Sequence, residues 1–373
     1  MRHLLVTNDF PPKHGGIQSY LWELWRRLPP ESFSVLTTPF ADSAAWDAEQ
    51  AFVVRRTRER VLLPTRSLTR RIDALAASEG AELVVLDPAL PLGALGPHLE
   101  RPYAVILHGA EVTVPGRLPG ARALLGRVLR GADRIIAAGG YPAAEAERAA
   151  GRSLPVTVVP PGVDAERFHV LGPAARAAAR AELGLPVDAT VVLALSRLVP
   201  RQGFDVVIEA AARLARRHPE VLVVVAGGGR DRPRLERLAR RTGAPVRFLG
   251  RVDDPLLPAL YGASDVFAMA CRDRWAGLEQ EGFGIVFLEA AAAGIPQLAG
   301  RSGGSHEAVD HERTGLVVDH PSDPAAVAAT LERLVADADL RHRLGAAARV
   351  RVDAELTYDH LAARLGDALE VHR

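Results

Sequence analysis

Short apolar runs of valine, leucine and isoleucine alternate with alanine- and arginine-rich stretches from one end of the chain to the other. Strands of a parallel sheet are apolar throughout when helices cover both faces of the sheet, and a helix then follows each strand. In the first half, the runs that fit such strands are HLLVTN, SVLTT, FVVRR, ELVVL, YAVILHG, RIIAA and VTVVPPG. In the second half they are TVVLALSR, VLVVVAGGG, VRFLG, DVFAMA, IPQLAG and GLVVD. The pattern predicts an α/β protein with two doubly wound sheets of about six strands each.

The chain is long enough for two domains, because its 373 residues exceed what a single core usually holds. Prolines and glycines interrupt the pattern at 159–173, and a new helical stretch begins there, which predicts a linker. We therefore expect one doubly wound, Rossmann-like domain over 1–165 and a second over 173–356. The last helical stretch, 357–373, can pack on either domain.

Composition and charge argue against several classes of protein. The chain is 48% hydrophobic and 24% charged, and no apolar run reaches the roughly 18 residues that span a bilayer. No leader segment precedes the first strand, so we expect a cytoplasmic protein. The net charge of +1 argues against a nucleic-acid partner. The single cysteine, Cys271, lies in an apolar run, which predicts a core residue and no cysteine-based metal site.

In doubly wound sheets, ligands bind beyond the carboxyl ends of the strands, so functional residues are expected in strand-to-helix loops. The first such loop, NDFPPKHGGIQSY, brings Gly15 and Gly16 to a helix that begins near Ile17. Glycines let the backbone approach an anion, and the free N–H groups and dipole of a helix start favour negative charge. A tight turn without a ligand is the alternative interpretation.

Two further loops carry single candidates. His108 ends the run YAVIL and is placed to bond a substrate hydroxyl or to stabilise developing charge, unless local backbone groups satisfy it. Arg197 follows TVVLALS, where its guanidinium can bind a diphosphate through two parallel hydrogen bonds. Arg201, farther along the same loop, also fits a solvated surface residue.

The stretch QEGFGIVFLEAAAAG, 280–294, sets two carboxylates around the start of a helix. Glu281 is expected in the loop, where it can accept bonds from sugar hydroxyls. Glu289 is expected inside the helix, in surroundings too apolar for an ordinary surface charge, and can reach a ribose. The backbone N–H groups expected to point at a phosphate belong to Phe283, Gly284 and Ile285. The alternative is a helix in which one glutamate caps the start and the other is an ordinary surface residue.

Arginines are concentrated in two segments. Residues 55–71 carry seven arginines against one glutamate, and residues 117–134 interleave arginine with leucine and valine at helical spacing. Such faces can lie on an anionic membrane surface. All but one of the 46 basic residues are arginine, the exception being Lys13, so a solvated helix face in an arginine-rich chain explains the pattern equally well.

Six motifs resemble, in their order, those of the retaining glycosyltransferases of family 4; they are GGIQSY, HGAE, PPGVD, SRLVPRQG, EGFGIVFLEA and SGGSHEAV. The resemblance covers nearly the whole chain and is strongest to the actinobacterial phosphatidylinositol mannoside mannosyltransferases. It implies the GT-B fold, in which two Rossmann-like domains face each other across a cleft. The first domain is then expected to bind the acceptor and the second the sugar nucleotide.

The resemblance also implies roles for individual residues. Glu281 is expected to contact the donor sugar, with His108 beside that sugar and Glu289 on the ribose. Arg197 is expected to bind phosphate, and Val252 in GRVDD to border the base. The other residues expected to bind the donor are Gly15, Gly16, Gln202, Gly282, Phe283, Gly284 and Ile285. The residues expected to face the acceptor or a membrane are Gln18, Arg66, Arg70 and Arg71.

One position departs from the family pattern. Members of the family usually have lysine where this chain has Gln202, so a positive charge that would partner Arg197 is missing. The departure leaves open a catalytically weak protein that binds sugar nucleotides.

We expect a metal-independent, cofactor-free hexosyltransferase that moves mannose from GDP-mannose to a phosphatidylinositol mannoside or related glycolipid. Its expected location is cytoplasmic, with peripheral attachment to the inner face of the plasma membrane. The alternatives are a family 4 transferase that uses a UDP-sugar on a soluble acceptor, and the sugar-nucleotide sensor that Gln202 suggests.

Overall fold

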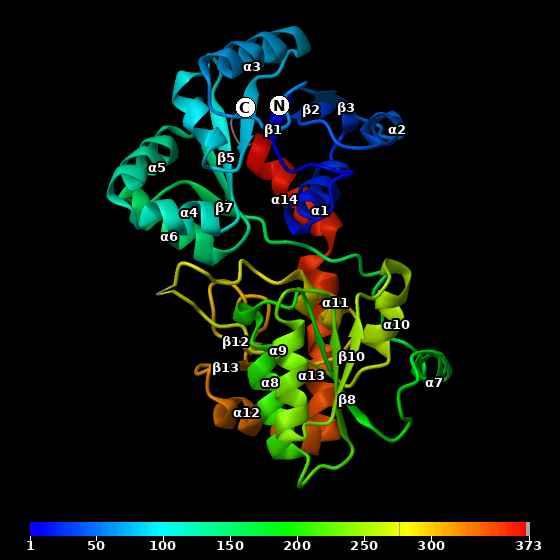
Figure 1. Cartoon of the computed structure of the whole chain (residues 1–373). Coiled ribbons are helices and arrows are strands. Elements are labelled where there is room, and N and C mark those ends of the chain that lie inside the picture. The colour runs from blue at the N-terminus through cyan, green and yellow to red at the C-terminus, as the bar shows by residue number, and fades with distance from the viewer. Residues whose placement is uncertain (276, 371–373) are drawn as a thin grey trace. The chain divides into compact units, whose positions relative to one another are not determined.

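The computed structural model describes residues 1–275 and 277–370, and these residues form two compact units (Figure 1). Unit 1 comprises Met1–Pro161 together with the C-terminal helix α14 (Tyr358–Glu370), and unit 2 comprises Gly162–Thr357. The chain therefore passes from one unit to the other twice.

Unit 1 contains a seven-stranded sheet in the order β3-β2-β1-β4-β5-β6-β7, with all neighbouring strands parallel. Its strands are β1 (His3–Thr7), β2 (Phe33–Thr37), β3 (Val53–Arg56), β4 (Leu83–Asp87), β5 (Tyr103–Leu107), β6 (Arg134–Ala137) and β7 (Val156–Val158). Its helices are α1 (Gly16–Trp25), α2 (Ser43–Ala48), α3 (Arg66–Glu79), α4 (Ala110–Gly116), α5 (Pro119–Gly131), α6 (Gly140–Ala150) and α14, with short 3-10 turns at Pro30–Ser32 and Leu92–His98.

Unit 2 contains a six-stranded parallel sheet in the order β10-β9-β8-β11-β12-β13. Its strands are β8 (Thr190–Leu195), β9 (Val221–Ala226), β10 (Val246–Gly250), β11 (Val266–Met269), β12 (Gln297–Gly300) and β13 (Gly315–Val318). Its helices are α7 (Pro173–Glu182), α8 (Phe204–Leu214), α9 (Arg232–Thr242), α10 (Leu257–Gly262), α11 (Ile285–Ala292), α12 (Pro324–Ala336) and α13 (Ala338–Arg351). Short helical turns lie at Pro200–Gln202 (η3), Asp254–Leu256 and Val352–Leu356.

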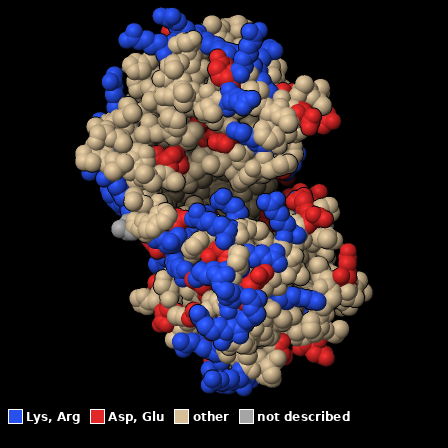
Figure 2. All heavy atoms as spheres, in the orientation of Figure 1, with Lys and Arg blue, Asp and Glu red and all other residues tan. Residues whose placement is uncertain are grey.

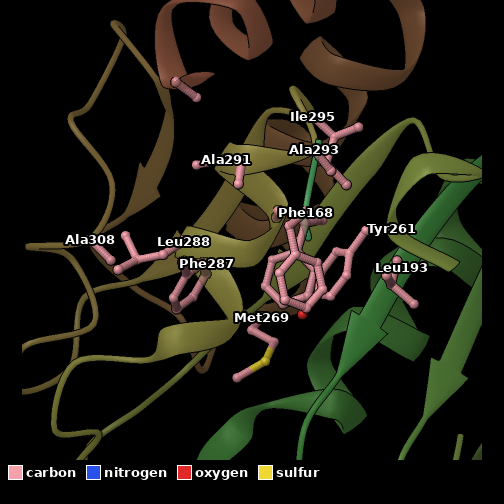
Figure 3. Packing of buried hydrophobic residues seen from close by; sticks show 14 of the residues in the cluster. Phe168, Leu193, Tyr261, Met269, Phe287, Leu288, Ala291, Ala293, Ile295 and Ala308 are labelled. Carbon is pink, nitrogen blue, oxygen red and sulfur yellow. The ribbon is translucent and has the colours of Figure 1, made fainter. Parts of the chain in front are cut away.

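The prediction of two doubly wound parallel sheets is confirmed, with seven strands in the first sheet and six in the second. Each sheet has buried apolar side chains on both faces, as the continuous valine and leucine runs predicted. In unit 2 one face packs against α8, α9 and α12, and the other against α10 and α11 (Figure 3). Cys271 is buried in the second of these cores, which confirms its expected core position.

In unit 1, α14 packs against α1 and completes one face of the sheet. Leu361, Leu365 and Leu369 share a buried cluster with Leu24 and Trp25 of α1. The last helix of the chain is therefore part of the core of the first unit. Across the described part of the chain, no helix combines the length and apolar character that a bilayer-spanning helix requires.

Candidate functional site at the carboxyl ends of the strands

Three neighbouring strands of unit 1 end in polar residues that bond to one another. Asp87 ends β4, is fully buried, and accepts a hydrogen bond from the Thr7 hydroxyl at the end of β1 at 2.6 Å. Its other carboxylate oxygen lies 2.6 Å from Nε2 of His108, which directly follows β5. Since β1, β4 and β5 are adjacent in the sheet, their carboxyl ends bring these side chains together.

Charge around His108 favours its protonated form. Burial lowers the pKa of His108, but the negative charges of Asp87, Glu111 and Asp9 outweigh burial, and the net direction is upward. The Glu111 carboxylate also accepts bonds from the backbone N–H groups of His108 and Gly109. The ring of Tyr20 packs edge-on against the imidazole, with 5.5 Å between ring centroids. The imidazole is thus oriented by an acid on one side and a ring on another.

The glycine loop of unit 1 leads into α1 beside this cluster. Gly15 is the cap residue and Gly16 the first residue of α1, and no side chain caps the helix start. Gln18, in the first turn, donates to Asp9 at 2.7 Å. Burial and the Asp87 charge raise the pKa of Asp9, although Lys13 opposes them. The Gln18 side chain therefore ties the first turn of α1 to a carboxylate whose pKa is raised.

In unit 2, the EGFG loop leads into α11 and is held by backbone packing. Gly284 caps α11, Phe283 is buried, and no side chain of the described residues caps the helix. The loop that contains Gly304 packs on it, and the Gly304 N–H donates to the Glu281 carbonyl at 3.0 Å. A Cβ on Gly304 would lie 2.0 Å from the Gly282 carbonyl oxygen, so only glycine fits there. The EGFG loop and the loop that contains Gly304 therefore pack together through their backbones.

Glu281 lies in the loop before α11 and is bound by two residues of η3. The Gln202 amide donates to the Glu281 carboxylate at 2.6 Å, and the Arg201 guanidinium forms an ion pair with the same oxygen at 3.3 Å. The carboxylate is therefore oriented in the absence of any ligand.

Glu289 lies within α11 and is bound by a tyrosine of α10. The Tyr261 hydroxyl donates to one oxygen of Glu289 at 2.6 Å. Burial raises the pKa of Glu289, and the bond from Tyr261 opposes this rise. Figure 3 shows Tyr261 beside Phe168, with 5.6 Å between their ring centroids. The aromatic core thus fixes the hydroxyl that orients this carboxylate.

The remaining predicted residues lie after strands β8 and β10 and in helix α3. Arg197 follows β8, is exposed, and its guanidinium has no hydrogen bond or ion pair with the residues that the structure describes. Val252 is partly buried just after β10. Arg66, Arg70 and Arg71 are exposed in the first turns of α3.

Sequence analysis did not select Asp87 or Tyr261, although each binds a candidate residue. Asp87 carries a signal, because it is a carboxylate directly at the end of an apolar strand, LVVLD. Nothing in the sequence indicates the role of Tyr261, because only the packing of α10 on α11 brings its hydroxyl to Glu289. The interpretation of Arg201 as a solvated surface residue does not fit its side chain, which is only 16% exposed.

Two doubly wound units, each with a parallel sheet and with polar side chains or glycine loops at the carboxyl ends of the strands, match the GT-B fold class. A family model described as Glycosyltransferase Family 4 matches residues 14–167, and one described as Glycosyl transferases group 1 matches residues 175–351. The chain belongs to the family 4 glycosyltransferases and is a glycosyltransferase.

Relatives of known activity match almost the whole chain. A GDP-mannose-dependent alpha-(1-6)-phosphatidylinositol monomannoside mannosyltransferase from Mycobacterium tuberculosis is 41% identical, over 99% of this chain and 98% of its own. A GDP-mannose-dependent monoacylated alpha-(1-6)-phosphatidylinositol monomannoside mannosyltransferase from Corynebacterium glutamicum is 35% identical, over 98% and 97%. Among solved structures, HepE from Anabaena in complex with UDP has a TM-score of 0.83, covers 100% of both chains and is 21% identical, so it supports the fold alone.

Proposed function

We propose that this glycosyltransferase moves mannose from GDP-mannose to a phosphatidylinositol mannoside or related glycolipid, with retention of configuration at the anomeric carbon. The observation that carries the proposal is the full-length similarity to relatives that are named for this donor and this class of acceptor. In this proposal unit 2 holds the nucleotide and unit 1 binds the acceptor.

The donor-binding roles that we propose follow the geometry of unit 2. The uncapped start of α11, with the N–H groups of Phe283, Gly284 and Ile285, suits the diphosphate, because a helix start favours negative charge. Arg197 is exposed, and its guanidinium is unpaired among the residues that the structure describes, which suits a phosphate that arrives with the ligand. Glu289 has one oxygen bonded to Tyr261 and a second oxygen available for ribose hydroxyls. Glu281 is oriented for the sugar.

The chemical step that we propose needs negative charge to be stabilised on the leaving phosphate. The acceptor hydroxyl oxygen bonds to the anomeric carbon as the bond from that carbon to the phosphate oxygen breaks, on the same face of the sugar. The acceptor proton passes to the departing phosphate. Arg197 and the start of α11 stabilise the charge as it develops. The role proposed for His108, which Asp87 holds, is contact with the transferred sugar.

Contact with an anionic membrane surface is proposed for the arginine-rich segment of unit 1. Arg66, Arg70 and Arg71 lie at the amino end of α3, where the helix dipole disfavours positive charge, and α3 has no acidic residue in its first turn. Just before them, Val61 and Leu63 are 56% and 58% exposed. Arg71 forms an ion pair with Glu59 at 3.4 Å, and both side chains are exposed. Apolar side chains beside exposed cations suit the interface of an anionic bilayer. In Figure 2 basic side chains gather over the region of α3.

A donor and acceptor panel tests the proposed function. The full chain is incubated with GDP-mannose, UDP-N-acetylglucosamine or UDP-glucose, and with either phosphatidylinositol monomannoside in vesicles or a soluble inositol acceptor. We expect nucleotide release only with GDP-mannose and the lipid, and an α-configured product by NMR. Faster release from a UDP-sugar, or with the soluble acceptor, would replace this assignment by the alternative transferase. Nucleotide binding without turnover would indicate a sensor.

A further inference from the structure

Two consecutive residues of η3 bind the same oxygen of Glu281. The Gln202 amide nitrogen is 2.6 Å from Glu281 Oε2, and Arg201 Nη2 is 3.3 Å from it. Gln202 is only 2% exposed, so its amide must find partners within the protein.

Cys271 fixes which way the Gln202 amide points. The Cys271 thiol donates to the Gln202 carbonyl oxygen at 3.2 Å. Burial, together with the Glu281 charge, raises the pKa of Cys271 well above its ordinary value, so the thiol keeps its proton and remains a donor. The amide N–H groups therefore face Glu281. Residue 202 is a neutral link between a thiol and a carboxylate.

The backbone holds η3 firmly enough for this arrangement to be specific. The Arg201 carbonyl accepts a bond from the Arg272 N–H at 2.9 Å. At Gly203, which follows η3 with a φ of +75°, a Cβ would lie 1.9 Å from the Ala270 carbonyl oxygen. Arg201 also has a buried Nε with no partner among the described residues. The guanidinium is thus fixed beside Glu281 and retains an unused donor.

We propose that Arg201 is a positioning residue that supplies the positive charge beside Glu281, so that this carboxylate has a cation although residue 202 is neutral. The inference rests on the proposed role of Glu281 in binding the donor sugar. It assigns to Arg201 the cation at the Glu281 carboxylate, which is separate from the charge beside Arg197 that the family pattern places at residue 202.

Four variants of the full chain test the role of Arg201. Arg201→Gln removes the charge, Arg201→Lys keeps it, and Arg201→Gln/Gln202→Lys moves it to residue 202. Gln202→Lys alone adds a second cation. Arg216→Gln is the matched control, because Arg216 is an exposed arginine of unit 2 without a side-chain partner in the described residues. Thermal unfolding checks that each variant is folded.

Transfer kinetics and GDP binding are measured for each variant. We expect Arg201→Gln to lower kcat/KM for GDP-mannose about tenfold or more, because a charge-assisted contact to Glu281 is lost. GDP affinity should change less than about threefold, since GDP lacks the sugar that Glu281 is proposed to bind. Arg201→Lys and the double variant should recover most of the lost activity, and Gln202→Lys alone should gain little.

Four results would overturn the inference, and the first three concern Arg201→Gln and the double variant. They are normal kcat/KM in folded Arg201→Gln, an equal loss of GDP affinity, and a double variant no better than the single one. A tenfold gain from Gln202→Lys alone would also overturn it, because residue 202 would then be where charge is missing. If the parent protein prefers another donor in the panel, the variants are compared on that donor. An error in the proposed donor then appears in the parent, whereas an error in the proposed role of Arg201 appears only in the variants. Absence of turnover with every donor would contradict both.

Discussion

The two units place polar groups at the carboxyl ends of very similar sheets, but they hold those groups in different ways. In unit 1 the side chains end the strands themselves, and Thr7, Asp87 and His108 are bonded to one another in a buried network. In unit 2 they lie in loops that are held by close backbone contacts, such as that of Gly304 with Gly282. The cluster of Thr7, Asp87 and His108 is therefore tied to the stability of the unit 1 sheet. The loops of unit 2 can be altered with a smaller loss of folding stability.

The largest expected effect tests that difference directly. Asp87→Ala should lower the free energy of unfolding by about 3–5 kcal/mol, the cost of breaking a buried charge pair by removing one partner. Glu281→Ala, at the partly exposed carboxylate of unit 2, should cost clearly less stability while abolishing transfer. Denaturant unfolding and activity are measured for both variants. Equal destabilisation by the two changes would remove the contrast between the units.

The surface of unit 1 carries exposed arginines at the start of α3, which are proposed to face a membrane. Replacing Arg66, Arg70 and Arg71 with glutamine should weaken binding to anionic vesicles by about 1 kcal/mol per residue at low salt. The loss should shrink at high salt because the charges are screened. The matched control replaces the exposed unit 2 residues Arg213, Arg240 and Arg241 with glutamine. Equal sedimentation of both triple variants with vesicles would contradict a membrane face on unit 1.

Backbone packing in unit 2 is tested by a single added methyl group. Gly304→Ala should cost about 1–3 kcal/mol through overpacking and displace the EGFG loop, with weaker GDP binding by calorimetry. Gly172→Ala is the control, because Gly172 has a φ of −66° and no atom within 4 Å of an added Cβ. If both variants bind GDP like the parent, the contact between the glycine loops does not shape the nucleotide site.

The proposed contact between Glu289 and the ribose predicts an effect on GDP binding, about as large in free energy as the effect of Gly304→Ala on stability. Glu289→Gln should weaken GDP binding by about 1–3 kcal/mol, the range for a hydrogen bond to a charged group. Calorimetry with free GDP measures the affinity, and an unchanged value would exclude the ribose role.

The smallest expected effect is a pH dependence of stability that arises from the His108–Asp87 pair of unit 1. The pKa of His108 is raised in the folded protein, so the stability that it contributes is fully present below its ordinary pKa of about 6.5. This contribution is lost as the pH rises through the higher folded value. The difference in the free energy of unfolding between the parent and His108→Gln should therefore shrink from pH 6 towards pH 9. A difference that stays constant would show that the pair with Asp87 does not depend on protonation.

The sequence allowed the strands to be predicted well because a buried parallel strand is apolar throughout, as in VVLAL of β8. It also placed Glu281 before α11 and Glu289 within it, because glycines mark the helix start. It could not predict the partners of these residues. Tyr261 meets Glu289 across 28 positions and Cys271 meets Gln202 across 69, and both contacts depend on how helices and loops pack.

The return of α14 to unit 1 bears on how chains of this kind can be recombined. A segment that ends at Pro161 would lack the leucines of α14 and leave the apolar side chains of α1 open to water. Unit 2, by contrast, is a continuous stretch inserted within unit 1. In an exchange of domains between related proteins, unit 2 is therefore the part to transfer. The two segments that form unit 1 should stay together.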